Sequence, residues 1–74
     1  MGKIYFSRHA KRQMKWRKIS DEEVVSTISR PEEIQDSIKG RKNAYKHINQ
    51  KWIKVTFKEE DYRIIIITVI YKDK

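Results

Sequence analysis

The chain has 74 residues, a formal net charge of +8, a charged fraction of 38% and no cysteine. This length predicts a single domain over residues 1–74, and the lack of cysteine excludes a disulfide framework or a thiolate metal site. No apolar run reaches the roughly 20 residues of a membrane span, and Met1–Phe6 is too short for a signal peptide, so we expect a soluble, cytoplasmic protein without membrane contact.

Positive charge is concentrated in two blocks of the sequence. Residues 1–20 hold seven Lys or Arg residues and no acid, and residues 39–58 hold seven more, again without an acid. Residues 21–38 carry six acids against Arg30 alone. Cations without interspersed acids favour a surface that binds polyanions, although a lysine-rich face also serves simply to solubilise a small domain.

The first predicted element is a helix from Arg8 to about Arg17, with Ser7 as its N-cap. On a helical wheel, the face that we expect to be buried contains Ala10, Met14 and Arg17. An adjacent stripe contains His9, Gln13 and Trp16. His9 therefore lies at the edge of the buried arc, where a side chain is held and still reaches solvent.

A second helix is predicted from the capping box Ser20-Asp21-Glu22-Glu23. The acids of its first turn suit the positive end of the helix dipole. Pro31 ends this helix, because proline disfavours a helical conformation in the residue before it. Its apolar stripe contains Val24, Val25 and Ile28.

The remaining chain predicts four strands, at residues 33–38, 44–48, 52–57 and 63–71. Gly40 ends the first, Asn49-Gln50 forms a tight turn, and residues 58–61 form another turn. The third alternates apolar and polar residues, as a half-buried strand does, and the fourth is apolar on both faces, as a central strand is. The order predicts an α+β fold: two N-terminal helices packed on a small antiparallel sheet of about four strands. The helices cover one sheet face and leave the other face, or a rim, for binding.

The opening of the chain resembles the DUF4258 family, whose usual start is H-A-x-x-R-M-x-x-R-x-I. The residues that carry this resemblance are Phe6-Ser7-Arg8-His9-Ala10, then Met14, Arg17 and Ile19. Further similarities are the acidic helix start, the Pro-Glu pair after the helix, Gly40-Arg41, Tyr45, and Thr-Val near the end of the last apolar strand. The resemblance implies a RelE-like fold of the barnase-and-colicin-like group of nucleases.

The resemblance also implies a metal-independent endoribonuclease that acts as the toxin of a toxin–antitoxin pair. Its partners would be RNA, either mRNA or tRNA and with or without the ribosome, and a cognate acidic antitoxin; no cofactor is implied. Carried over by position, the catalytic candidates are His9, Arg17, Arg41, Tyr45 and Thr68. RNA is then cleaved by attack of its own 2′-hydroxyl, with His9 as acid or base and the arginines holding the phosphate.

The chain departs from the family pattern at two positions. Gln13 stands where arginine is common, so one cation of the opening helix is missing. The chain ends in Thr68-Val69-Ile70-Tyr71, where relatives often have Thr-Val-Tyr, so Tyr71 faces opposite to Thr68 in a strand.

Other basic and aromatic residues have weaker assignments. The candidates for RNA binding outside the catalytic set are Arg8, Lys11, Arg12, Lys42, Lys46, His47 and Lys54. Aromatic packing in the core or in hairpins is expected for Trp16, Trp52 and Tyr62. No metal site is expected, because the two histidines lie in different elements and no carboxylate has ligand spacing to either.

Two other functions fit the same sequence. The fold can bind RNA or DNA without cutting it, and His9 then has a structural role. Alternatively, the chain is an interaction module that docks an acidic protein and never contacts nucleic acid.

Overall fold

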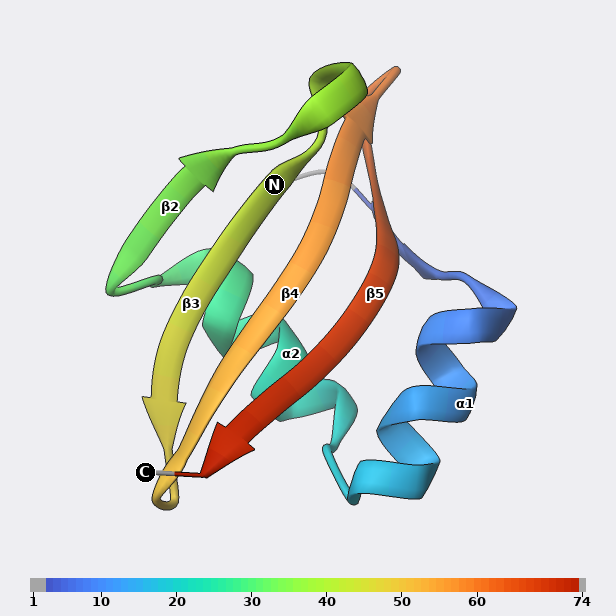
Figure 1. Cartoon of the computed structure of the whole chain (residues 1–74). Helices are drawn as coiled ribbons and strands as arrows, with labels where there is room; N and C mark the ends of the chain where they lie inside the picture. The colour runs from blue at the N-terminus through green and yellow to red at the C-terminus, as the bar shows by residue number, and fades with distance from the viewer. Residues whose placement is uncertain (1–2, 74) are drawn as a thin grey trace.

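The computed structural model describes residues 3–73 of the chain. These residues form an α+β structure, as the sequence predicts (Figure 1). In chain order its elements are β1 (Lys3–Phe6), α1 (Arg8–Arg17), α2 (Asp21–Ser29), β2 (Glu33–Asp36), the 3₁₀ helix η1 (Ile38–Gly40), β3 (Lys42–Ile48), β4 (Lys51–Glu60) and β5 (Arg63–Asp73).

The strands form one sheet in the order β1-β5-β4-β3-β2. Strand β1 pairs with β5 in parallel, and every other pair is antiparallel. The sequence predicts about four antiparallel strands, and β1 is the strand that it misses. A four-residue strand whose parallel partner lies at the other end of the chain has no turn signal beside it. The helices therefore follow a strand instead of opening the fold.

Both helices begin at the predicted caps. The Ser7 hydroxyl accepts the Ala10 N–H at the start of α1, and Lys18 ends that helix in the left-handed conformation. Ser20 and Glu23 form the predicted capping box of α2. These contacts satisfy N–H groups that have no partner within the helix. No helix within residues 3–73 is long and apolar enough to cross a membrane.

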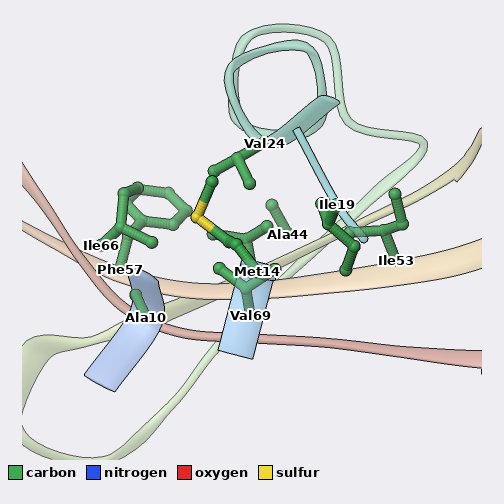
Figure 2. Close-up of a cluster of buried hydrophobic side chains, with 10 residues drawn as sticks. Ala10, Met14, Ile19, Val24, Ala44, Ile53, Phe57, Ile66 and Val69 are labelled. Carbon is green, nitrogen blue, oxygen red and sulfur yellow. The ribbon is translucent and has the colours of Figure 1, made fainter. Parts of the chain in front are cut away.

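The hydrophobic core lies between the two helices and one face of the sheet. Figure 2 shows the Met14 side chain of α1 reaching toward Val24 of α2 and Phe57 of β4. The other buried apolar side chains of this core are Ala10, Ile19, Ala44, Ile53, Val55, Ile66 and Val69. Thr27 is buried with them, and its hydroxyl donates to the Glu23 carbonyl at 2.8 Å.

Helix α1 lies along the part of the β5 edge that β1 does not reach. Strand β1 pairs with β5 only over Arg63–Ile66. Beyond that point the Ser7 hydroxyl donates to the Ile67 carbonyl, and the Gln13 side-chain carbonyl accepts the Val69 N–H at 2.9 Å. Gln13 thus supplies the acceptor that a neighbouring strand would supply, which an arginine side chain at this position could not do.

Several predicted boundaries and packing assignments differ from the structure. Strand β4 continues to Glu60, and the turn before β5 is formed by Asp61 and Tyr62, both with positive φ. Trp16 and Tyr62 were expected to pack in the core or in a hairpin, and this is wrong, because their exposed fractions are 80% and 95%. A helical wheel or a strand alternation shows which face of one element a side chain occupies. Whether that side chain is buried depends on a second element that packs against that face.

A pair of substitutions tests the division of the sheet into a buried and a solvent-facing side. We expect Ile53→Ala to lower the free energy of unfolding by about 2–5 kcal/mol, because it opens a cavity between helices and sheet. The matched change Lys72→Gln on the other face should alter it by no more than about 0.5 kcal/mol. Urea unfolding followed by circular dichroism measures both, and equal effects would contradict the described packing.

Candidate functional site

In the described part of the chain, both helices cover the same face of the sheet, and we call the opposite face the open face (Figure 1). Strand β4 shows the division clearly, since Ile53, Val55 and Phe57 are buried against the helices. Alternate side chains of a strand point to opposite faces, so the residues between these belong to the open face. With the strand register, the open face contains Asn43, Tyr45, His47, Trp52, Lys54, Thr56, Thr68, Ile70 and Lys72.

Three ring side chains lie close together on the open face. The Tyr45 and Trp52 rings are stacked, with centroids 5.6 Å apart and an angle of 18° between their planes. The His47 ring lies 4.2 Å from the Trp52 ring, tilted by 47°. His47 and Trp52 are direct cross-strand partners in the register of β3 and β4. Such a group of rings offers flat surfaces on which unpaired bases stack.

A pocket of about 240 Å³ lies beside the stacked rings, lined by Tyr45, Trp52, Lys54, Ile70 and Lys72. Its two ammonium groups come from β4 and β5. Neither forms an ion pair with any carboxylate that the structure describes. Aromatic and aliphatic surface next to uncompensated positive charge suits a nucleotide, because the rings accept the base and the ammonium groups attract the phosphate.

A carboxylate from another part of the chain holds His47. Glu32 lies between α2 and β2, and its backbone N–H donates to the Tyr45 carbonyl at 2.8 Å. The Glu32 carboxylate accepts the backbone N–H of His47, and its oxygen lies 3.5 Å from His47 Nδ1. The backbone hydrogen bond from His47 lowers the pKa of the Glu32 carboxyl below its usual range. The His47 side chain and the Lys46 charge also lower this pKa, whereas desolvation of the carboxyl raises it. Glu32 is therefore ionised at neutral pH.

Tyr45, Thr68 and Arg41, which the family resemblance implies are catalytic, lie on or next to the open face. Thr68 is the β5 partner of Thr56, whose hydroxyl donates to Asn43 Oδ1 at 2.7 Å. Arg41 has an extended backbone directly before β3, so the same alternation assigns it to the side of Asn43. The structure thus brings these three residues to one surface of the sheet.

The two catalytic candidates of α1 lie apart from that surface. His9 is exposed, and the described residues give its side chain no hydrogen bond or ion pair. Arg17 lies with Trp16 and Tyr71 at a second pocket, of about 380 Å³. Tyr71 pairs with Ile53 and so belongs to the helix-covered face, opposite to Thr68 as the sequence predicts. Among the described residues, the buried Nε of Arg17 has no hydrogen-bond partner.

The residues predicted to bind RNA are divided between the two sides of the sheet. His47 and Lys54 belong to the open face, whereas α1 carries Arg8, Lys11 and Arg12. The Lys11 ammonium lies 2.9 Å from the Asp21 carboxylate. Lys46 donates to the Ser26 hydroxyl of α2 at 3.1 Å, and Lys42 pairs with the buried Phe57, so both lie on the helix-covered side.

Sequence reasoning missed Trp52, Ile70, Lys72 and Glu32 as members of the site. The alternation of β4 contained the signal for Trp52, since it places this ring on the same face as Lys54. Ile70 and Lys72 follow in the same way from the register of β5 with β4, which the sequence does not specify. Glu32 had no signal, because its position depends on the path of the chain after Pro31.

The charged groups of the open face suit an anion more than a cation. Lys54 and Lys72 are cationic, and Glu32 is the acid that contacts His47. Within the described residues, no three His, Cys, Asp or Glu side chains gather to hold a metal ion. The site offers stacking surface, positive charge and an imidazole held next to a carboxylate.

Comparison with known proteins identifies a family. The family described as "Domain of unknown function (DUF4258)" matches residues 6–71. No curated protein and no solved structure matches the chain. The matched range runs from the end of β1 nearly to the end of β5, so it contains both helices and every open-face residue named above except Lys72.

The contact of Glu32 with His47 predicts a specific dependence of stability on pH. Because folding lowers the pKa of Glu32, its charge stabilises the fold above the usual carboxyl range, and this contribution is lost as pH falls through the lower, folded-state pKa. Glu32→Gln keeps an oxygen acceptor for the His47 N–H and removes the charge. We expect the substitution to reduce the free energy of unfolding at about pH 6 and to have little effect at about pH 3. Urea unfolding at both values checks this, and a pH-independent difference would contradict it.

Proposed function

Because the chain belongs to the DUF4258 family, whose function is unknown, we propose a function from the open face itself. We propose that the protein binds single-stranded RNA on this face and cleaves it without a metal ion. The observation that carries the proposal is the stacked pair Tyr45–Trp52 beside Lys54 and Lys72. These side chains offer a nucleotide contacts for both its base and its phosphate.

The geometry favours a single strand over a duplex. In a double helix the flat faces of the bases are stacked on one another, so they are not available to Tyr45 and Trp52. The pocket beside the rings has a volume of about 240 Å³, which accommodates one unstacked base and excludes a helix. A single strand lying across β4 and β5 would place bases on the rings and phosphates near the ammonium groups.

Electrostatics supports a polyanionic ligand. The net charge is +8, but several cations are paired, such as Lys11 with Asp21 and Lys58 with Glu60. Lys54 and Lys72 have no such partner within the described chain. Phosphates that replace counterions at these groups make binding fall as salt rises.

Two exposed imidazoles support cleavage in addition to binding. RNA carries its own nucleophile, the 2′-hydroxyl, so a metal-independent ribonuclease needs proton transfer and positive charge near the phosphate. Imidazole is the side chain best suited to proton transfer near neutral pH. His9 on α1 and His47 on the open face are the two candidates, and both are exposed.

We also propose that the protein is the toxin of a toxin–antitoxin pair whose antitoxin is acidic. The support is the positive charge of the chain and the cationic helix α1, which has no acid in its first turn. A short acidic reading frame next to the gene would strengthen this proposal. Normal growth of cells that express the protein without its partner would contradict it.

Binding to RNA should depend on Trp52 and not on the other tryptophan. We expect Trp52→Ala to weaken the affinity for a single-stranded oligoribonucleotide by about 5- to 150-fold, the usual worth of one base-stacking contact. Trp16→Ala is the matched control, because this ring lies on α1, outside the open face, and we expect it to leave affinity unchanged. Fluorescence anisotropy at low salt measures both. Equal effects, or no binding by the wild type, would remove RNA binding at this face and favour a module that docks an acidic protein.

Cleavage should need the 2′-hydroxyl and no divalent ion. We expect the purified protein to cut a single-stranded oligoribonucleotide in excess EDTA, leaving a 2′,3′-cyclic phosphate and a 5′-hydroxyl. The DNA oligonucleotide of the same sequence should be bound and remain intact, because it lacks the nucleophile. Denaturing gels of end-labelled strands measure the products. If RNA is bound but stays intact, the protein is a nucleic-acid-binding domain without nuclease activity.

A further inference from the structure

We propose that His47 is the residue that transfers the proton on the open face, and that Glu32 is its positioning residue. This inference rests on the proposed ribonuclease function and assigns its chemistry to a particular imidazole. The sequence favoured the other histidine, His9, through the family resemblance alone. The contacts of the two side chains in the structure favour His47.

His47 is held at two points and remains accessible. Its backbone N–H donates to the Glu32 carboxylate, whose oxygen also lies 3.5 Å from Nδ1. The Trp52 ring lies 4.2 Å from the imidazole. The side-chain exposed fraction of His47 is still 38%. A carboxylate that accepts a hydrogen bond from Nδ1–H leaves the Nε2 lone pair available to a substrate.

The surroundings of His47 also suit a phosphate. From β4, Trp52 contacts the imidazole and also lines the pocket of the open face. From β5, Lys72 is the cross-strand partner of Trp52 and contributes to the same pocket. The charged groups that face this region are therefore Glu32 on the chain before β2, Lys54 on β4 and Lys72 on β5. Lys46 of β3 lies on the helix-covered side and acts on Glu32 through its charge. A base in the pocket would bring its phosphate and 2′-hydroxyl near the imidazole.

His9 lacks comparable support. It lies on the exposed surface of α1, and within residues 3–73 its side chain has no hydrogen bond or ion pair. His9 also lies on a helix that packs against β5, whereas the stacked rings lie on β3 and β4. An imidazole without a partner has no fixed orientation, and proton transfer needs a positioned group.

In the proposed reaction, the 2′-oxygen of RNA replaces the 5′-oxygen on phosphorus. Nε2 of neutral His47 takes the proton of the 2′-hydroxyl, whose oxygen forms a bond to phosphorus. The bond between phosphorus and the 5′-oxygen breaks, and this oxygen takes a proton from water. The imidazolium returns its proton to the hydroxide that remains, so one proton has moved from the 2′-oxygen to the 5′-oxygen. The Glu32 carboxylate stabilises the transient imidazolium, and the ammonium groups of Lys54 and Lys72 stabilise the crowded phosphorane.

Glu32 also has a structural role, and the test must separate the two. Its carboxylate accepts the N–H of His47 where β2 no longer pairs with β3, so it caps the edge of the sheet. Glu32→Gln preserves an oxygen acceptor for this N–H and removes the charge next to the imidazole. A purely structural Glu32 would therefore be replaced well by Gln, whereas a positioning Glu32 would not.

The experiment compares cleavage of a mixed-sequence, single-stranded oligoribonucleotide in EDTA by the wild type, His47→Ala, His9→Ala and Glu32→Gln. Anisotropy with the DNA strand of the same sequence measures binding separately. We expect His47→Ala to slow cleavage by about 100-fold or more and Glu32→Gln by about 10-fold or more, with His9→Ala within a few-fold of the wild type. Unchanged circular dichroism would show that the variants are folded.

The pH–rate profile gives a readout that a structural role would not change. A general base must be unprotonated, so the wild-type rate should rise with pH until the imidazole has lost its proton. The residual rate of His47→Ala should lack this rise, whereas His9→Ala should keep it. Cleavage that His47→Ala leaves intact would overturn the inference while the ribonuclease function stands. Binding without cleavage by the wild type would overturn the inference and the nuclease function together, and leave RNA binding intact.

Discussion

Within residues 3–73, the two α-helices cover one face of a five-stranded sheet and leave the other open, and the rest of the structure depends on that constraint. The alternation of β4 decides which side chains they cover: Ile53, Val55 and Phe57 face the helices, and Trp52 and Lys54 do not. The stability of the domain and its candidate site are therefore built on opposite sides of the same strands. Side chains of the open face are not part of the hydrophobic core, so they can contact a ligand without disturbing the packing of the core.

The edge of β5 shows how a departure from a family pattern fits the fold. A sheet edge with unpaired N–H and C=O groups tends to pair with other chains. Here β1, Ser7 and Gln13 cover successive parts of that edge. An arginine at position 13 would add a cation to α1 but could not accept the Val69 N–H. The glutamine thus exchanges one positive charge for an internal hydrogen bond, and the positive charge at the candidate site comes from β4 and β5.

The sequence predicted the elements that depend on neighbouring residues and missed those that depend on distant ones. Both helices, the caps of Ser7 and Ser20, and the helix end before Pro31 follow from local chemistry. Strand β1 and the pocket residues Ile70 and Lys72 depend on pairing with strands elsewhere in the chain. The alternation of β3 places Tyr45 and His47 on one face, but Glu32 reaches His47 only because the chain turns back after α2. Local patterns thus predicted part of the open face and none of the carboxylate contact.

The division of the sheet also changes how the family's residues are interpreted. Arg17 and Thr68 look like members of one site when they are carried over by position, but α1 and the strand pleat place them on opposite sides of β5. A phosphate bound by the Tyr45–Trp52 region would meet Lys54 and Lys72 before it met Arg17. The buried Nε of Arg17 at the end of α1 is more easily explained by the packing of that helix next to Tyr71. An acidic partner that inhibited the proposed activity would therefore have to reach the open face, because neutralising α1 alone would leave the aromatic pocket accessible.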